Sequence, residues 1–544
     1  MSIDTIPKPF YGPWEGDTKI AAVSFGAEAQ LPTIEEQAED NAWTLAKYFK
    51  LHLHPSDMQA KNHLKLDDLP PGVTLRQIYS DFLGYLLKHT KSFFDDRILD
   101  GKQIWARYSP TMEVIIAHPN GWGIREQTFL RSAAVAAGFS TTDQASTKVR
   151  FVSEAEASVH FCIHHTNLGT VLKPGTNFAV CDAGGSTVDT TLYSVTSMRP
   201  NLKLKEERAS ACVQAGAIFV DFEVEKHLRR TLTNAGINSE DVVEYTKTGV
   251  KDFESFAKRA FKDETTEQSV TIAHTRFNNT AIRARRGRIA LSGSKVKECF
   301  DVCVKEIITS VDQQINGINA SYILLVGGFG DSPYIQSEFK KRYEPRGSRI
   351  THNTNDSNSK AVADGALIWS TLSSVHSRAP RYSFGIDVLT PFLFGTHSLQ
   401  GRVPFVHLTG EQMVSGAWSQ IVQKGVALDS KVVCRRSYVR RYSTGTPGLE
   451  FFTEELMAYS GEGTPEWAYS PNKTLYPGFR VSCTIKANLK KLEGALVSAT
   501  GRNGTRYWSL SFEICIRFGG TELESYLEWE EHVGISHLTP EADN

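Results

Sequence analysis

Two aspartates and a glycine pair are the first residues in this sequence whose types and spacing suggest chemistry. Residues 177–194, NFAVCDAGGSTVDTTLYS, contain an apolar run that ends at Asp182, then Gly184 and Gly185, and then an alternating run through Asp189. This pattern predicts a β-hairpin with a glycine-rich tip. Adjacent glycines lack the Cβ atoms that would keep a phosphate away from the backbone N–H groups. The tip is therefore a candidate phosphate-binding site.

The two carboxylates that flank the tip favour a divalent cation. Carboxylates repel a phosphate unless a cation lies between them, and Mg²⁺ held through water molecules suits this arrangement. We therefore expect Asp182 and Asp189 to bind the metal. The expected phosphate-binding residues of the tip are Gly184, Gly185, Ser186 and Thr187. A plain acidic hairpin is the alternative for Gly-Gly alone, but the complete D-x-G-G-x-T-x-D pattern favours the phosphate site.

A second glycine pair follows another apolar strand. In YILLVGGFGDSPYIQSEFKKRY, residues 322–343, the strand breaks at Gly327 and Gly328, and a helix begins near Pro333. A strand, a Gly-Gly turn and a helix N-terminus offer backbone room and a positive dipole for the sugar-phosphate side of a nucleotide. We expect this turn to be a second nucleotide contact.

The elements around these turns indicate a mixed α/β sheet domain. We expect buried strands at 113–119 and 322–326. Helices are expected at about 34–50, 74–95, 124–137, 217–231, 251–262 and 294–317, with a further helix that begins at Glu154. The helix at 360–370 is rich in small residues and should pack closely against a neighbour.

From about residue 384 the apolar period changes to two, which predicts a β-rich domain over 384–535. The clearest strands are FRVSCTIKA (479–487) and YWSLSFEICIRF (507–518). CRRSYVRRY (434–442) carries four arginines on a predicted strand, for which a charged edge strand is favoured over a site for an acidic partner. The complete expected organisation is a leader at 1–18, an α/β domain at 19–375, a linker at 376–383, the β-rich domain and a tail at 536–544.

Bulk properties describe an ordinary soluble chain. It has 544 residues, of which 40% are hydrophobic and 22% charged, and its formal net charge is −1. Nothing in the charge points to nucleic acid or to a membrane surface, and no signal peptide or long apolar run occurs. We expect a cytoplasmic or nuclear protein. Its eight cysteines contain no CxxC pair, so buried free thiols are favoured over a zinc site.

Five segments in one order resemble a known family. They are FKLHLHP (49–55), VSEAEAS (152–158), DAGGSTVD (182–189), LVGGFGDSPYIQ (325–336) and AVADGA (361–366). Together they are similar to the heat shock 70 kDa protein 12-like branch of the 70-kDa heat-shock-protein family. The resemblance implies an actin-like ATPase domain, in which two ribonuclease-H-like lobes close over ATP or ADP with Mg²⁺, followed by the β-rich domain.

The resemblance also implies roles for individual residues. Glu154 matches the glutamate that positions the attacking water, and Asp182 and Thr187 would act on the phosphates and metal from the second lobe. Lys50 matches a lysine that approaches the transferring phosphate, with a solvated lysine at a helix end as the alternative. The glycines at 327 and 328 match the adenosine motif. The adenine-side basic residues would be Lys258 and Arg259.

The first lobe departs from the family pattern. The family begins with a strand and the loop D-x-G-T-T, whereas the best local match here is VSFGAEA, with Ser24 in place of the aspartate and Ala27 and Glu28 in place of the threonines. A better alternative matches FGAEA to a later W-G-x-x-A-like segment. The first hairpin would then be absent. In both cases we expect half of the phosphate clamp to be missing and the first lobe to be incomplete.

These observations predict a chaperone-like ATP- or ADP-binding protein with weak or lost hydrolysis. Its expected partners are the nucleotide and protein clients. The alternative is a non-catalytic interaction or scaffold protein on an actin-like fold. A sugar kinase is disfavoured because no residue suggests itself as a sugar-binding base.

Overall fold

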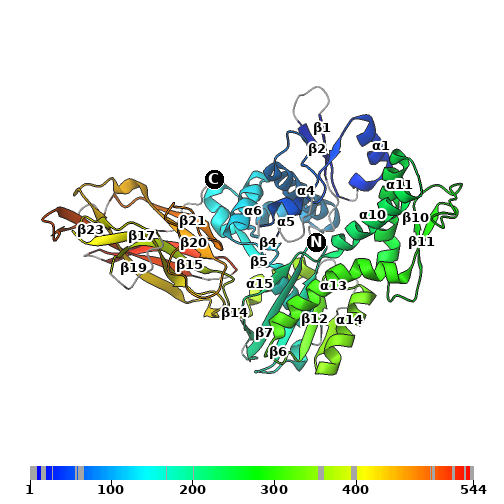
Figure 1. Cartoon of the computed structure of the whole chain (residues 1–544). Helices are drawn as coiled ribbons and strands as arrows, with labels where there is room; N and C mark the ends of the chain where they lie inside the picture. Colours follow the sequence, from blue (N-terminus) through cyan, green and yellow to red (C-terminus); the bar gives the residue numbers. More distant parts are fainter. Residues whose placement is uncertain are drawn as a thin grey trace. The chain divides into compact units, whose positions relative to one another are not determined.

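The chain divides into two compact units in the computed structural model (Figure 1). Unit 1 comprises Met1–Trp122, Phe129–Leu204 and Ser210–Val375, and unit 2 comprises Gly123–Thr128, Lys205–Ala209 and His376–Asn544. The structure describes residues 9–13, 20–26, 28–55, 58, 66–166, 168–199, 201–352, 361–393, 401–490, 492, 496–517, 521–531 and 534–538. Unit 1 mixes helices with several sheets, whereas unit 2 is built mainly from strands.

A small antiparallel sheet opens unit 1. β1 (Phe10–Pro13) lies between β2 (Ile20–Ser24) and β3 (Thr44–Leu45). β1 lies inside the segment 1–18 that we expected to be a leader. Both of its aromatic side chains are buried, so this strand is part of the folded unit.

The single helix predicted over 34–50 is wrong in its second half. α1 spans Pro32–Asp40, the chain then forms β3, and α2 spans Phe49–Leu53. Ala42 and Tyr48 have φ values of 53° and 49°, which are incompatible with a continuing right-handed helix. Because β3 pairs with β1, sheet pairing overrides the local helix propensity here.

The rest of the N-terminal half of unit 1 is a parallel strand pair with helices. β4 (Val114–His118) pairs with β5 (Val149–Ser153). The helices are α4 (Leu75–Arg97), α5 (Gly101–Tyr108), α6 (Ile124–Ala136) and α7 (Ala145–Lys148). Tyr11, Phe82, Ile116 and Phe151 belong to one core that joins both sheets and α4.

A mixed sheet forms the centre of the C-terminal half of unit 1, with neighbouring strands in the order β13-β12-β6-β7-β8 and with β9 beside β7. β6 and β7 are antiparallel, whereas β12 runs parallel to β6 and to β13. The bounds are β6 (Asn177–Ala183), β7 (Val188–Ser197), β8 (Lys203–Glu206), β9 (Ala211–Val213), β12 (Tyr322–Val326) and β13 (Arg349–His352). The predicted hairpin at 177–194 is confirmed.

Helices α8 (Glu154–His165), α13 (Gly293–Ile315) and α14 (Pro333–Tyr343) pack on strands of this sheet. The other helices of this half are α9 (Leu168–Val171), α10 (Ala217–Asn234), α11 (Ser239–Asp252), α12 (Lys258–Ala260) and α15 (Ala361–Leu372). β10 (Gln268–Thr271) and β11 (Arg288–Leu291) form a separate pair. A Cβ atom on Gly365 of α15 would lie 1.9 Å from the carbonyl oxygen of Ala157 in α8. The predicted close packing of the small-residue helix is therefore confirmed.

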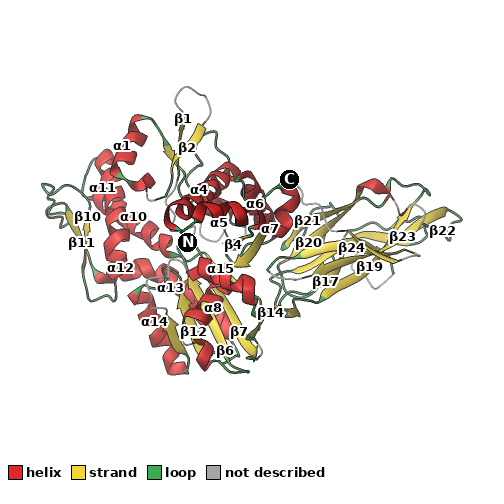
Figure 2. Ribbon diagram, turned by 180° about the vertical axis from the view of Figure 1, so that it is seen from behind, coloured by secondary structure: helices red, strands yellow, loops and turns green. Residues whose placement is uncertain are grey.

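Unit 2 consists mainly of two antiparallel sheets, ordered β16-β17-β15-β20-β21 and β19-β23-β24-β25 (Figure 2). β22 is added to β23 and β18 pairs with β14. Strands of both sheets contribute to one core, including Ile386, Leu456, Phe512 and Ile514. The bounds are β14 (Val375–Arg378), β15 (Ser383–Pro391), β16 (Phe405–Val406), β17 (Gln412–Val422), β18 (Leu428–Asp429), β19 (Val433–Tyr442), β20 (Phe452–Tyr459), β21 (Phe479–Ala487), β22 (Val497–Thr500), β23 (Arg506–Arg517), β24 (Glu524–Glu531) and β25 (Gly534–Leu538).

The period-two pattern correctly predicted two strands of unit 2, β21 and β23. Of the predicted inward residues of β23, Leu510, Phe512, Ile514 and Ile516 are buried, Trp508 is half-buried, and Phe518 lies outside the described residues. In β21 the pattern is less regular, because Ile485 is buried but Phe479 and Cys483 are half-buried and Val481 is 42% exposed. The strands were therefore predicted correctly as secondary structure, whereas the face of each strand that is covered depends on packing against the second sheet.

The arginine-rich strand β19 lies at the edge of its sheet. Three of its arginines contact acceptors of unit 2: Arg435 pairs with Glu528 at 2.9 Å, Arg436 donates to the carbonyl oxygen of Gln420, and Arg440 pairs with Glu454. These contacts agree with a charged edge strand and give no support to a site for an acidic partner.

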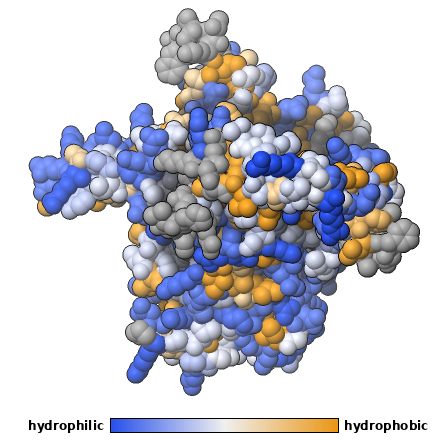
Figure 3. Space-filling model, turned by 90° about the vertical axis from the view of Figure 1, so that its left-hand side faces the viewer, coloured by the Kyte–Doolittle hydropathy of each residue, from blue (hydrophilic) through white to orange (hydrophobic). Residues whose placement is uncertain are grey.

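Exposed apolar side chains are dispersed over the chain. Figure 3 shows hydrophobic residues in separate patches among hydrophilic ones on the face in view. In the part of the chain that the structure describes, no helix combines the length and the apolar character that a membrane crossing requires.

Candidate functional site

The predicted phosphate hairpin forms a closed tip between β6 and β7. Asp182 and Asp189 face one another across the two strands, and the Gly184 N–H donates to the Thr187 carbonyl oxygen at 3.0 Å. Both aspartates are buried, with 6% and 1% of their surfaces exposed. Two carboxylates at directly opposite positions of a hairpin repel one another unless donors or a cation compensate. The two carboxylates are therefore the main electrostatic feature of the tip.

The N-terminus of α10 holds the backbone of the same tip. The N–H groups of Ala217 and Ile218 donate to the carbonyl oxygens of Gly184 and Gly185 at 3.1 and 2.9 Å. A Cβ atom on Gly216 would lie 2.3 Å from the Gly185 oxygen, so only glycine permits this approach. The first turn of α10 thus fixes the conformation of the tip.

The second glycine turn touches the hairpin directly. β12 runs parallel to β6, with Val326 beside Asp182, and the Phe329 N–H donates to the Ala183 carbonyl oxygen at 2.9 Å. Gly327 has a φ of 81°, and a Cβ atom on it would lie 2.5 Å from Asp182 Oδ1. The two turns therefore lie side by side at the carboxyl ends of neighbouring parallel strands of one sheet.

Room for a ligand exists next to this contact. A Cβ atom on Gly328 would meet no other atom within 4 Å, so the backbone of this residue faces open space. Ser332, at the N-terminus of α14, carries a buried hydroxyl that has no hydrogen-bond partner among the described residues. Thr187 Oγ1, in the hairpin tip, has the same property. Both hydroxyls can donate to an added oxygen acceptor, which fits the phosphate and sugar oxygens of a nucleotide.

Lys50 and Glu154 meet in a buried ion pair. Lys50 Nζ of α2 lies 3.2 Å from Glu154 Oε1, and the two side chains are only 3% and 11% exposed. Glu154 is the first residue of α8, which Ser153 caps by accepting the N–H of Glu156. The alternative in which Lys50 is a solvated lysine is therefore wrong. The structure brings together two residues that we assigned to the reaction from distant parts of the sequence.

Sequence reasoning missed Ser158, which lies one turn further along α8. Its hydroxyl donates to Asp182 Oδ2 at 2.7 Å, and both residues are buried. Positions i and i+4 of a helix lie on one face, so the same face of α8 presents Glu154 and Ser158. The VSEAEAS segment contains both residues, but nothing in the sequence shows that the serine reaches the hairpin.

Asn120 was also missed, although it follows the predicted strand at 113–119. Its backbone N–H donates to Asp189 Oδ1 at 3.1 Å, and its side chain donates to Thr191 Oγ1 at 3.1 Å. Asp189 and Thr191 are two residues apart in β7 and lie on one face. The loop after β4 is thereby joined to the hairpin of the C-terminal half. The tendency of polar residues to gather where strands end could have identified Asn120.

His118 adds a neutral buried group to this region. It ends β4 opposite Ser153 of β5, and its Nδ1 lies 2.9 Å from the Pro119 carbonyl oxygen. Burial lowers the pKa of His118 to about 4; the carbonyl of Pro119 partly opposes this shift, and the charge of Lys50 adds to it. His118 is therefore neutral at pH 7 and leaves Lys50 as the positive charge beside Glu154.

The predicted adenine-side residues differ in their surroundings. Lys258 Nζ lies 2.6 Å from Asp221 Oδ2 of α10, and both side chains are largely buried. Arg259 is exposed. A π-helical turn at Phe253–Ala257 precedes them, which sequence periodicity does not reveal. Lys258 is thus tied to the helix that holds the phosphate hairpin.

The chemistry of the hairpin suits Mg²⁺ bound together with phosphate. Carboxylate oxygens are the ligands that this ion prefers, and it commonly keeps water molecules and substrate phosphates in its shell. Within the described residues, no third acidic, histidine or cysteine ligand atom groups closely with Asp182 and Asp189. The pair therefore fits a metal that the nucleotide helps to hold, not a site made by the protein alone.

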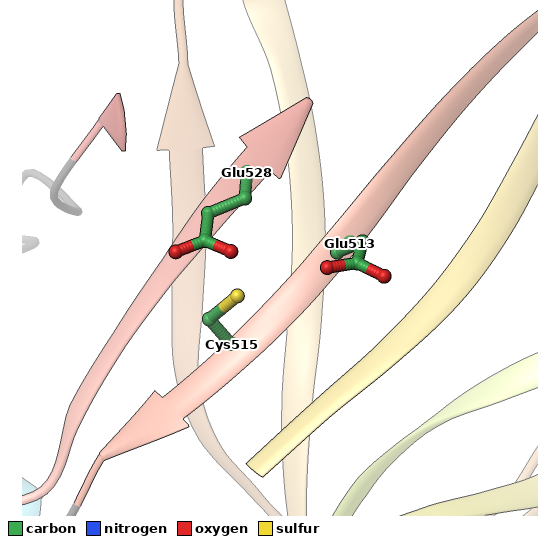
Figure 4. A group of neighbouring side chains, drawn as sticks. All are labelled: Glu513, Cys515 and Glu528. Atoms are coloured by element: carbon green, nitrogen blue, oxygen red, sulfur yellow. The ribbon is translucent and has the colours of Figure 1, made fainter. Parts of the chain in front are cut away.

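A different cluster, in β23 and β24, has metal-ligand residue types but a different explanation. Glu513, Cys515 and Glu528 have ligand atoms within 4.8 Å of one another (Figure 4). Arg435 already donates to both oxygens of Glu528, and Ser437 donates to Glu513 at 2.8 Å. Burial also raises the pKa of the Cys515 thiol to about 12, which opposes thiolate ligation. The guanidinium group supplies the positive charge here.

The segment VSFGAEA, the local match to the first phosphate loop, packs against α4 through Phe25 and Gly26. Phe25 stacks on Tyr85 of α4 with ring centroids 4.7 Å apart, and Gly26 approaches the same ring. Glu28 is exposed. Ala27, the other residue of this match, lies outside the described residues.

Comparison with known proteins gives a distant relationship. No protein-family model matches the chain. Heat shock 70 kDa protein 12A from Homo sapiens is 22% identical over 387 residues, which are 65% of this chain and 52% of that protein. The Mus musculus protein of the same name is 22% identical over 308 residues, 49% of this chain and 44% of its own. The chain spans about half the length of these curated relatives. It is therefore distantly similar to a 70-kDa heat-shock protein, and its mixed α/β structure with several sheets is compatible with an actin-like fold.

Proposed function

We propose that unit 1 binds ATP or ADP with Mg²⁺ in the manner of a chaperone-like protein of the 70-kDa heat-shock type. The observation that carries the proposal is the direct contact between the two glycine turns at Asp182. One nucleotide can reach both turns, because they lie on neighbouring strands. The distant similarity to heat shock 70 kDa protein 12A supports the same assignment. Unit 1 would be an actin-like domain of two ribonuclease-H-like lobes.

Each part of the site has a role in this proposal. The backbone of Gly184, Gly185 and Ser186 and the hydroxyl of Thr187 would hold phosphate oxygens. Asp182, with Asp189, would face the metal. The adenosine side would lie at Gly327 and Gly328, with Lys258 and Arg259 near the base. When bound, the magnesium nucleotide supplies the positive charge that the paired carboxylates need and the oxygen acceptors that the buried hydroxyls need.

Hydrolysis is proposed to be weak or lost. Phosphoryl transfer depends on donors and charges placed on both sides of the terminal phosphate. Phe25 of the candidate first loop stacks on Tyr85 of α4, and Lys50 is already paired with Glu154. Loss of one electrostatic partner of a transition state costs about 10²- to 10³-fold in rate. Turnover near background is therefore expected, with binding retained.

Titration calorimetry of the full chain tests the binding proposal. Mg-ATP and Mg-ADP should bind, and Asp182→Asn should weaken binding by on the order of 2 kcal/mol, about thirtyfold in Kd, because a charge that complements the metal is removed. Arg435→Ala, in unit 2, is the control and should leave Kd unchanged. Absence of binding to the native chain, or equal losses in both variants, would refute the site. The scaffold alternative would then be preferred, with protein partners as the only ligands.

A further inference from the structure

Ser158 occupies a position from which it controls the direction of one carboxylate. Its hydroxyl lies 2.7 Å from Asp182 Oδ2, and only 1% of the serine surface is exposed. The other oxygen, Oδ1, lies against the Cα atom of Gly327, where a Cβ atom would come within 2.5 Å. The carboxylate is thus held from two sides, by α8 and by the turn after β12.

We infer that Ser158 is a positioning residue for metal-dependent nucleotide binding, acting through Asp182. The inference rests on the proposed function of the hairpin and names a residue that this function does not itself require. Ser158 would touch neither metal nor nucleotide. Its contribution is to select one rotamer of Asp182 and so to fix where the negative charge lies.

The physical reason is the pairing of two carboxylates in the hairpin. Asp182 and Asp189 repel one another across the strands, so an unrestrained Asp182 side chain would turn away from its neighbour. The backbone N–H of Asn120 restrains Asp189, and the Ser158 hydroxyl restrains Asp182. With both carboxylates fixed, a divalent cation finds its ligands already oriented, which lowers the ordering cost of binding.

Helix α8 makes this restraint rigid. α15 packs on α8 closely enough that Gly365 nearly touches the Ala157 carbonyl oxygen. Figure 2 shows α15 beside α8, and α8 packs in turn on β6 and β7. The same helix carries Glu154 one turn earlier. A hydroxyl on such a helix acts as a fixed donor, unlike one on a mobile loop.

The test measures how nucleotide binding to the full chain depends on Mg²⁺. Fluorescent ADP is titrated with Mg²⁺ from an EDTA-treated start, and the Mg²⁺ concentration at half-maximal enhancement is recorded. Ser158→Ala should raise this concentration about tenfold, the usual effect of removing a group that orients a metal ligand, while binding in EDTA stays unchanged. Ser158→Cys, with a weaker donor of similar size, should shift it in the same direction. Ser158→Thr keeps the hydroxyl and should restore the native value.

A matched control separates positioning from general stability. Ser348 is also a buried serine of the C-terminal half, and its hydroxyl donates to the Ala320 carbonyl oxygen at 2.8 Å, before β12 begins. Ser348→Ala should change the melting temperature as Ser158→Ala does, but leave the Mg²⁺ midpoint unchanged.

The outcomes distinguish this inference from the proposed function. Native Mg²⁺ midpoints in Ser158→Ala and Ser158→Cys, alongside a large shift in Asp182→Asn, would overturn the role of Ser158 and leave the nucleotide site in place. Equal shifts in the Ser158 and Ser348 variants would also overturn it. Failure of the native chain to bind nucleotide, or no effect of Asp182→Asn, would remove the proposed function and the inference together.

Discussion

The buried pair of Lys50 and Glu154 allows a quantitative prediction. Glu154→Gln removes one charge and leaves Lys50, 3% exposed, without its carboxylate partner. Breaking a buried pair in this way costs about 3–5 kcal/mol. Because Lys50 Nζ also lies 6.0 Å from the Trp122 ring centroid, we expect the lower end, about 3 kcal/mol.

The double variant Lys50→Met/Glu154→Gln should lose less free energy of unfolding than the sum of the losses in the two single variants. It removes both charges of the pair, so we expect a coupling free energy of about 2 kcal/mol. Urea unfolding at pH 7 measures the free energies, and hydrogen exchange of peptides from α2 and α8 localises the loss. The control is the exposed pair Arg229 and Glu225, with side chains 50% and 41% exposed, where coupling should stay below about 0.5 kcal/mol. Additive effects at Lys50 and Glu154 would refute the reasoning.

Two further predictions concern pH and unit 2. Because the pKa of His118 is lowered to about 4 from an ordinary 6.5, the unfolded chain binds this proton more tightly, so stability should fall by up to about 3 kcal/mol as the pH decreases from 6.5 to 4. His118→Gln should weaken the dependence of the urea unfolding midpoint on pH between pH 6.5 and 4. An unchanged dependence would contradict the lowered pKa of His118. Arg435→Ala should destabilise unit 2 by about 1 kcal/mol, because Glu528 loses the Arg435 guanidinium but Arg435 itself is half exposed. Hydrogen exchange of peptides from β19 and β24 during urea unfolding would show the loss, and an unchanged urea midpoint would contradict the prediction.

Local sequence patterns predicted the parts of the site that depend on local structure. The hairpin at 177–194 and the turn after β12 each depend on consecutive residues. An apolar run followed by glycines is compatible with few structures other than a strand that ends in a turn. The prediction of a single helix at 34–50 was wrong because this segment depends on a contact that is distant in the sequence. Its second half is decided by pairing with β1, some thirty residues away in the chain.

The contacts that complete the site join residues far apart in sequence. Lys50 and Glu154 are separated by 104 positions, Asn120 and Asp189 by 69, and Ser158 and Asp182 by 24. Two of these six residues, Asn120 and Ser158, are small polar residues with no motif of their own. Their partners, Asp189 and Asp182, are fixed only when the sheets and α8 have assembled, so no local pattern identifies these pairings.

The structure also shows a difference between Asp182 and Asp189 that the sequence pattern does not reveal. In the D-x-G-G-x-T-x-D pattern both are equivalent candidates for a metal. Asp189 is held by the backbone of Asn120, so it connects the hairpin to the loop after β4. Asp182 is held by Ser158 and lies against Gly327, so it stands where the phosphate hairpin and the second glycine turn meet. A cation at the tip would therefore act on both turns through Asp182, whereas loss of Asp189 would first loosen the connection between the two halves of unit 1.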